Sequence, residues 1–339
     1  MQQILLIYTG GTIGMIKDTT SSLLKPFNFD NLLEQIPQLK EFNAKIDTLS
    51  IPEPKDSADM LPRDWQFLAK LIFDNYKLYD GFVVLHGTDT MSYTSSALSF
   101  MFENLKKPII FTGSQLPIGD IRTDALENVL TAIEITLLTK DNRPLITEVG
   151  LYFGNRLLRA NRSVKLSSSQ FNAFDSPNYP ALITSGVKLN VDHSVLLKCD
   201  FNRETIFNSE LNQRVFLLKL HPGIDEEMFN ALCEKVEFEI LLIESYGSGT
   251  IFTAKWFVKA VKRLKQCKKI VINCTQCMHG GIAEGVYESS ALLKQAQVLN
   301  SRDMTTESAL TKSMILLAKN SGFLAFKDNF ELSFSGEQE

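Results

Sequence analysis

In the first half of the chain, short apolar segments run directly into loops of glycine and hydroxyl residues. The three pairs are Ile4–Tyr8 with TGGTIG (9–14), Phe82–Leu85 with HGTDT (86–90), and Pro108–Phe111 with TGSQ (112–115). The apolar segments do not alternate with polar residues, which is typical of parallel strands buried on both faces. Ligands of such sheets bind beyond the carboxyl ends of the strands, where these loops fall.

Apolar residues at helical spacing lie between the strand segments. The predicted helices contain Trp65, Leu68, Ile72 and Tyr76 after Pro62, a segment from Tyr93 to Leu105, and Leu126, Val129, Leu130, Ile133 and Leu137. Strands that alternate with helices predict an α/β fold with a parallel-rich sheet and helices on both of its faces.

A length of 339 residues suits about two domains. The strand–helix alternation is lost over residues 170–213 and resumes at Val215–Leu220. We therefore predict two α/β domains joined by a linker. The larger N-terminal domain, with the glycine-rich loops, spans residues 1–189. The linker spans residues 190–213, and the smaller C-terminal domain spans residues 214–339.

Composition excludes several classes of protein. The net charge is −4 and no basic stripe is present, so we expect no nucleic-acid partner. The apolar segment Ile4–Tyr8 is too short for a signal sequence or a membrane span, so we expect a cytoplasmic protein without membrane association. The chain has only five cysteines, which makes a disulfide framework improbable.

The first loop does not match a nucleotide-binding motif, because Gly10 and Gly11 are adjacent and no G-K-[ST] follows. Two glycines after a strand either form a tight turn or let the backbone approach a ligand while Thr12 presents its hydroxyl. In the second loop, the carboxylate of Asp89 either pairs with an ammonium or caps the following helix. The loop alone leaves both interpretations open.

Two other polar segments are candidates for a site. In DSADM (56–60), Ser57 either holds a carboxylate or belongs to a polar turn. Lys165 is either solvated or helps to remove a proton from a threonine hydroxyl. Cys274 and Cys277 form a single CxxC without a second pair, so we predict neither a metal site nor a dithiol redox site. For His86 we expect a buried, hydrogen-bonded histidine.

Taken together, these stretches resemble the L-asparaginase family, specifically its cytoplasmic type I branch. The matching segments are YTGGTIGM (8–15), DSADM (56–60) followed by Trp65, DGFVVLHGTDTMSYTSSALSFM (80–101), FTGSQLPIGDIRTDALEN (111–128), ANRSVK (160–165), SYGSG (245–249) and NCTQC (273–277). The resemblance implies hydrolysis of L-asparagine, and weakly of L-glutamine, without a cofactor. It also implies a homodimer or homotetramer.

The resemblance assigns roles residue by residue. Thr12 matches the nucleophile of the family, and a second catalytic group is matched by Thr88, Asp89 and Lys165. The loop that holds the α-carboxylate of the substrate is matched by Asp56, Ser57 and Ala58. Asp89 matches the acid that binds the α-ammonium beside Thr88, and the backbone carbonyl of Ser114 matches the acceptor of the side-chain amide nitrogen.

The sequence departs from the family at two places. The family usually carries a tyrosine on the loop after TGGTIG, and residues 15–27 contain none. Some type I members also bind asparagine at a regulatory site that is matched here by Thr275, Gln276 and Cys277. An arginine of that site corresponds to Glu244, which reverses the charge, so we expect no regulation of that kind.

Other classes of function share some of these features. One is the amidase subunit of a tRNA-dependent amidotransferase, which normally has an additional N-terminal domain before TGGTIG. Another is a non-catalytic amino-acid sensor on the same fold, against which the presence of Thr12, Thr88, Asp89 and Lys165 argues. A nucleotide-dependent oxidoreductase is disfavoured by the missing dinucleotide motif.

Overall fold

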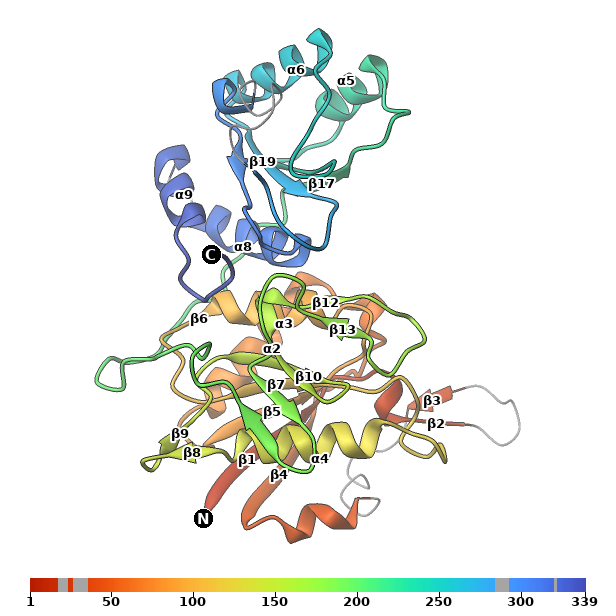
Figure 1. The fold of residues 1–339 in the computed structure, drawn as a ribbon, viewed down its shortest axis with the longest axis vertical. Helices are drawn as coiled ribbons and strands as arrows, with labels where there is room; N and C mark the ends of the chain where they lie inside the picture. The colour runs from red at the N-terminus through yellow and green to blue at the C-terminus, as the bar shows by residue number, and fades with distance from the viewer. Residues whose placement is uncertain (18–23, 27–35, 284–292, 320–321) are drawn as a thin grey trace. The chain divides into compact units, whose positions relative to one another are not determined.

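The computed structural model describes residues 1–17, 24–26, 36–283, 293–319 and 322–339 (Figure 1). The chain divides into two compact units, Met1–Ser209 and Glu210–Glu339. Each unit is built around its own mainly or wholly parallel sheet, which confirms the predicted fold class. No helix within the described ranges is long and apolar enough to cross a membrane.

The first unit contains an eight-stranded sheet in the order β15-β14-β11-β10-β7-β5-β1-β4. Its strands are β1 (Gln2–Tyr8), β4 (Ala44–Ser50), β5 (Gly81–Leu85), β7 (Ile109–Thr112), β10 (Val149–Phe153), β11 (Arg156–Arg159), β14 (Ile183–Ser185) and β15 (Leu189–Val191). The five strands from β4 to β10 are parallel, and β11, β14 and β15 add an antiparallel end.

Helices cover both faces of this sheet. Figure 1 shows α2 (Pro62–Asn75) and α3 (Met91–Met101) on one side and α4 (Ala125–Thr136) on the other. All four residues from Ile4 to Ile7 are at most 2% exposed, so successive side chains of β1 are buried on opposite faces. Burial of each such side chain contributes roughly 1.5–3 kcal/mol to the stability of the sheet.

The helix α3 ends earlier than the predicted segment Tyr93–Leu105. Phe102 and Glu103 instead form β6 (Phe102–Glu103), which pairs with β16 (Ile206–Phe207). Other short pairs are β2 (Met15–Lys17) with β3 (Leu24–Pro26), β8 (Thr139–Lys140) with β9 (Arg143–Pro144), and β12 (Val164–Lys165) with β13 (Phe174–Asp175).

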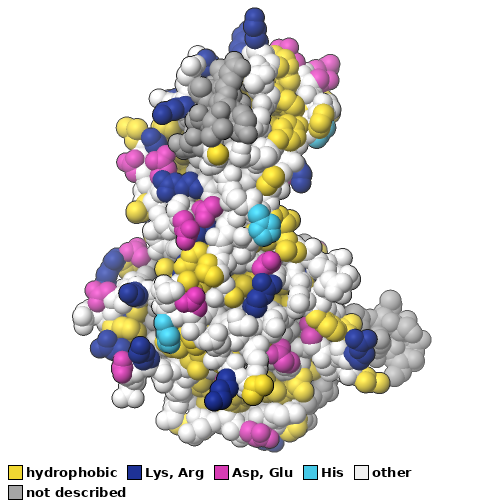
Figure 2. Space-filling view, viewed as in Figure 1, with side chains coloured by type: hydrophobic (Ala, Val, Ile, Leu, Met, Phe, Trp, Pro, Cys, Tyr) yellow, Lys and Arg dark blue, Asp and Glu magenta, His cyan; other side chains and the backbone are white. Residues whose placement is uncertain are grey.

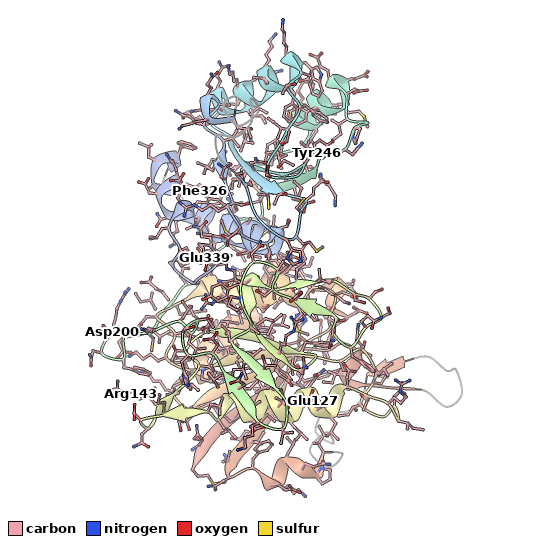
Figure 3. All side chains as sticks on the ribbon, in the orientation of Figure 1. Glu127, Arg143, Asp200, Tyr246, Phe326 and Glu339 are labelled. Atoms are coloured by element: carbon pink, nitrogen blue, oxygen red, sulfur yellow. The ribbon has the colours of Figure 1, made fainter. Side chains whose placement is uncertain are left out.

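The second unit has a four-stranded parallel sheet in the order β17-β18-β19-β20. Its elements are β17 (Val215–Lys219), α5 (Glu226–Lys235), β18 (Ile240–Ser245), α6 (Lys255–Gln266), β19 (Ile270–Thr275), β20 (Leu299–Asn300), α8 (Thr306–Ala318) and α9 (Gly322–Glu331). Leu241 and Ile243 pack with residues of α5 and α6. Leu242 packs on the opposite face with residues of α8 and α9, among them Phe326 (Figure 3).

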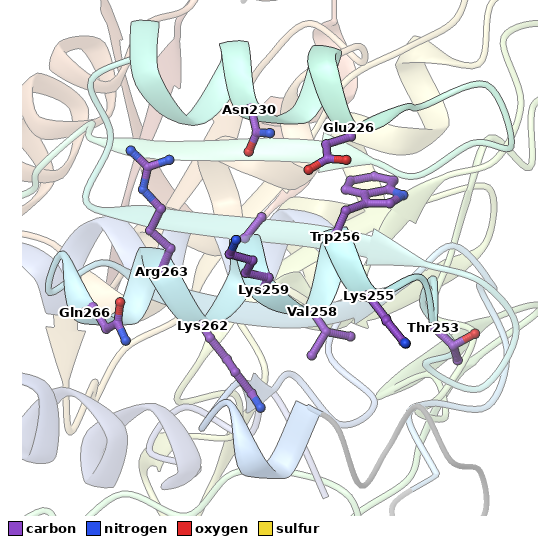
Figure 4. A pocket seen from close by; sticks show the side chains of 11 residues that line it. Glu226, Asn230, Thr253, Lys255, Trp256, Val258, Lys259, Lys262, Arg263 and Gln266 are labelled. Atoms are coloured by element: carbon purple, nitrogen blue, oxygen red, sulfur yellow. The ribbon is translucent and has the colours of Figure 1, made fainter.

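A groove of about 730 Å³ borders α5 and α6 (Figure 4). Phe257 and Leu264 anchor α6 in the core, while Lys259 and Arg263 on its outer face line the groove. None of the predicted site residues lines it. In Figure 2, basic and acidic side chains are interspersed on the visible face.

Candidate active site

The strand register brings the predicted loops to one edge of the large sheet. Tyr8, at the end of β1, lies beside Leu85 of β5 and Ser50 of β4. Leu85 in turn lies beside Thr112 of β7. Because these strands are parallel, the loops that follow them emerge at the same carboxyl edge, which is where α/β sheets bind ligands.

Thr9 joins three of the chain segments at this edge. Its backbone N–H and its hydroxyl both donate to the carbonyl of Leu85, each over 3.0 Å. Its own carbonyl accepts the N–H of Lys55 over 3.0 Å, immediately before the DSADM segment. The ends of β1 and β5 and the start of DSADM are therefore fixed to one another by hydrogen bonds.

Glycines allow the loops to approach more closely than side chains would permit. Gly11 has a φ of +85°, and a Cβ atom there would lie 2.4 Å from the Cα of Gly87. A Cβ atom on Gly87 would lie 2.6 Å from the hydroxyl oxygen of Ser57. Thr12, half-buried at the start of η1 (Thr12–Gly14), thus follows a residue in backbone contact with the loop that carries Thr88.

Thr88, Asp89 and Lys165 form a cluster in this structure. The ammonium of Lys165 donates to the hydroxyl oxygen of Thr88 over 2.9 Å and to the carboxylate of Asp89 over 2.6 Å. The Lys165 side chain is 18% exposed and that of Asp89 is 63% exposed. The N-cap position of α3 is occupied by Thr90, so Asp89 pairs with an ammonium and does not cap the helix.

Lys165 reaches the cluster because the segment before it is buried. The short helix η5 (Ala160–Arg162) packs against α3, and the Ser163 hydroxyl donates to the carbonyl of Ala160 over 2.7 Å. Arg162 is fully buried. The chain then forms β12, in which Lys165 pairs with Phe174 of β13. The buried helix η5 thereby fixes the position of Lys165, although the lysine itself lies in a polar stretch.

Ser57 is 1% exposed and is held by the HGTDT loop on both sides. Its hydroxyl oxygen accepts the backbone N–H of Asp89 over 3.2 Å, and its carbonyl accepts the hydroxyl of Thr90 over 2.7 Å. Asp56 caps η4 (Ser57–Asp59) by accepting the N–H of Ala58 over 3.0 Å. Asp56 and Ala58 are exposed at the same turn.

Ser114 is buried in the loop after β7, and its hydroxyl donates to the carbonyl of Leu116 over 2.6 Å. Its loop is bonded to Asp124 and Asn128 at the start of α4. Asp124 and Asn128 were not among the predicted site residues. The sequence signal for them is an acid at the start of a predicted helix with an asparagine four positions later. The same pattern is also typical of ordinary helix capping.

His86 is fully buried, as expected. Its Nδ1 lies 2.7 Å from the carbonyl oxygen of Gly87, which requires the Nδ1–H tautomer. Burial lowers the pKa of the imidazole to about 4. A histidine that is neutral at physiological pH and bonded to its own loop supports the backbone at Gly87.

The residues matched to a regulatory site lie in the second unit, at the carboxyl edge of its sheet. Thr275 donates to the carbonyl of Gly247, and the Gln276 side chain donates to the carbonyls of Leu220 and Glu244 over 2.7 and 2.9 Å. The N–H of Cys277 donates to the hydroxyl of Thr275 over 3.0 Å.

The carboxylate of Glu244 already accepts a hydrogen bond from a hydroxyl group. Its carboxylate accepts the hydroxyl of Thr306 over 2.7 Å, and the Lys219 ammonium lies 4.0 Å away. Cys274 is buried with its sulfur 3.7 Å from the Thr306 hydroxyl oxygen. Among the described residues, no three His, Cys, Asp or Glu side chains are grouped so as to hold a metal ion.

The segment 15–27, in which the sequence has no tyrosine, is only partly described. Its backbone is placed at β2 and β3, and residues 18–23 and 27 lie outside the described residues.

The site combines alcohol side chains, an ammonium and a carboxylate at the edge of a parallel sheet. This combination is typical of a hydrolase that activates an alcohol nucleophile.

The family model for the N-terminal asparaginase domain matches residues 3–196, and the model for the glutaminase/asparaginase C-terminal domain matches residues 214–330. L-asparaginase 1 of Escherichia coli K12 is 38% identical, over 94% of this chain and 92% of its own length.

Two solved structures extend the similarity over the whole chain. L-asparaginase I from Vibrio cholerae has a TM-score of 0.87 at 36% identity and covers 100% of this chain and 99% of its own. The thermostable L-asparaginase from Thermococcus kodakarensis has a TM-score of 0.90 at 32% identity and covers 99% of both chains. The protein therefore belongs to the asparaginase family and is an amidohydrolase.

Proposed function

We propose that the protein hydrolyses L-asparagine to L-aspartate and ammonia, in the cytoplasm and as a homodimer or homotetramer. The observation that carries the proposal is the cluster of Lys165, Thr88 and Asp89 beside the loop of Gly11 and Thr12. A threonine hydroxyl is a poor nucleophile unless a neighbouring group takes its proton, and this cluster can do so.

The reaction proceeds by attack of the Thr12 hydroxyl oxygen on the side-chain amide carbon of the substrate. Lys165 enters this step as the neutral amine, having released one proton to solvent. The hydroxyl proton of Thr12 passes through the Thr88 hydroxyl to the Lys165 nitrogen and returns by the same route to the amide nitrogen, the C–N bond breaks, and ammonia leaves. Backbone N–H groups near Gly87 and Thr88 stabilise the oxyanion. Water then cleaves the acyl–threonine ester, which releases aspartate and restores the hydroxyl of Thr12.

In this proposal the α-carboxylate and the α-ammonium of asparagine bind to different residues. Ser57 donates its hydroxyl proton to the α-carboxylate, because its oxygen already accepts the N–H of Asp89. Asp89 binds the α-ammonium through its exposed carboxylate. The carbonyl of Ser114 accepts the N–H of the side-chain amide. A turn formed by Asp56 and Ala58 places their backbone beside the carboxylate.

In the second unit, Glu244 stands at the position that matches a regulatory arginine of the family. The Glu244 carboxylate repels the carboxylate of a second asparagine, and Gln276 is already bonded to backbone carbonyls. We therefore propose that Thr275, Gln276 and Cys277 form no asparagine-binding regulatory site. The rate should follow asparagine concentration hyperbolically, and a sigmoidal curve would contradict this part of the proposal.

The test is release of ammonia from L-asparagine and from L-glutamine by the purified chain without tRNA. We expect release from asparagine, with much slower release from glutamine. Absence of release until tRNA and a partner are added would support an amidotransferase subunit, and binding of asparagine without release would support a sensor. Light scattering of the same preparation tests the proposed dimer or tetramer.

A further inference from the structure

Two side chains at the start of α4 hold the loop that follows β7. The carboxylate of Asp124 accepts the N–H of Gln115 at 3.1 and 3.0 Å and the N–H of Leu116 at 3.1 Å. The side-chain amide of Asn128 donates to the carbonyl of Gly113 over 2.9 Å and to Asp124 over 3.2 Å. Asn128 is buried and Asp124 is half-buried.

These contacts determine the direction of the Ser114 carbonyl. The Ser114 carbonyl and the Gln115 N–H belong to one peptide group, and in a trans peptide they point in opposite directions. All peptides in the described residues are trans. Because the N–H points at Asp124, the Ser114 carbonyl points away from it. The bond from Asn128 to Gly113 fixes the preceding peptide in the same manner.

The carbonyl held in this way lies at the edge that carries the Lys165 cluster. A Cβ atom on Gly113 would lie 2.4 Å from the carbonyl oxygen of His86, so the loop after β7 is in contact with the HGTDT loop. An N–H that donates to a carboxylate also polarises its peptide group, which strengthens the carbonyl at the opposite side as an acceptor.

We propose that Asp124 and Asn128 are positioning residues for the departing nitrogen of the substrate. They aim and polarise the Ser114 carbonyl, which accepts an N–H of the carboxamide. This inference rests on the proposed hydrolysis of asparagine. As the C–N bond breaks, the nitrogen gains a proton and becomes a stronger donor, so the contact contributes more to departure of ammonia than to binding of the amino-acid end of the substrate.

The test compares an amide with an ester that shares its amino-acid end. L-Aspartate β-methyl ester loses methanol, and its leaving oxygen has no hydrogen to donate before cleavage. The measurement is kcat/KM, which reports the steps up to release of the leaving group. Asp124→Asn should lower kcat/KM for asparagine about 10–100-fold and for the ester less than about threefold.

Two further variants separate this role from stability. Glu134→Gln, at an exposed position of the same helix, removes a charge and should leave both substrates unchanged. Asn128→Leu, which leaves the Gly113 carbonyl without this donor, should show the same amide-selective loss as Asp124→Asn. A thermal unfolding transition measured for each variant shows that the variant is folded before its kinetics are compared with the wild type.

Equal losses on amide and ester in both Asp124→Asn and Asn128→Leu would overturn the inference, because they would show a structural role alone. A wild-type chain that cleaves the ester and not asparagine would contradict the proposed function itself. An amide-selective loss in either folded variant supports the inference, since a general disturbance of the site would slow both substrates.

Discussion

The ammonium of Lys165 donates to the hydroxyl of Thr88 over 2.9 Å, although 77 positions separate the two residues in the chain. The same ammonium contacts Asp89 over 2.6 Å. Since the Thr88 oxygen accepts from the lysine, its own proton is directed elsewhere. Once Lys165 has released one proton, its amine can receive a proton through the Thr88 hydroxyl. We propose that the two residues act as one functional unit.

Residues that act as one unit should show strongly non-additive effects on kcat. We expect Lys165→Met and Thr88→Val each to lower kcat for asparagine by roughly 10²–10⁴-fold, the range for loss of general acid–base catalysis. The double variant should be little slower than the slower single variant. Steady-state kinetics of the three variants provides the measurement. Losses that multiply would show that the residues act independently, and an unchanged kcat in Lys165→Met would show a solvated lysine.

Ser57→Ala should act mainly on substrate binding. Loss of a hydrogen bond to a charged group costs about 1.5–3 kcal/mol, which corresponds to roughly 10–100-fold in kcat/KM. 3-Aminopropanamide is asparagine without its α-carboxylate, and the loss should shrink with this substrate. Ser50→Ala, at an exposed serine of β4, is the matched control. An equal loss on both amides would mean that Ser57 does not hold the carboxylate.

Gly11→Ala should separate the two loops that form the site. The new Cβ atom would lie 2.4 Å from the Cα of Gly87, in a backbone conformation with a φ of +85°. We expect a loss of stability of roughly 2–4 kcal/mol and a large loss of kcat. Gly119→Ala meets no atom within 4 Å and should change neither quantity. Wild-type unfolding and kinetics in Gly11→Ala would contradict the close approach.

His86 should make the first unit less stable in acid. Burial lowers the pKa of His86 to about 4 from an ordinary value of 6.5, so the unfolded state binds the proton first. The contribution is complete above pH 6.5 and falls as the pH drops toward 4, by about 3 kcal/mol in total. Denaturant unfolding between pH 4 and 8 measures it. His86→Asn should flatten this pH dependence, and an unchanged slope would contradict the low pKa.

Local sequence patterns predicted β1, β5 and β7 and the loops after them, because these strands contain uninterrupted apolar runs. The buried strand β10 was not predicted. The antiparallel end of the sheet had no such signal. β14 and β15 have three residues each, too few to establish a period, and their pairing depends on a turn that brings Ser185 beside Leu189. Short strands of this kind are determined by tertiary contacts.

The site was predictable to different degrees. Thr12, Ser57 and Asp89 lie in loops that follow strand-like segments, so the parallel topology brings these loops to one edge. Lys165 lies in a polar stretch and had no local signal, because its position depends on η5 packing against α3. The residues alone left it between a solvated lysine and a proton acceptor, and the family resemblance assigned the catalytic role. Asp124 has the sequence signature of a helix cap, and its bonds to the Ser114 loop are visible only in the fold.

The identity of the nucleophile is the central claim, and kcat for asparagine in Thr12→Ala tests it most directly. We expect a folded variant whose kcat is lower by on the order of 10³-fold or more, as for loss of a nucleophile elsewhere. Thr12→Ser, which keeps a hydroxyl, should retain far more activity than Thr12→Ala. Near-wild-type kcat in folded Thr12→Ala would contradict the account, because another group would then carry out the attack.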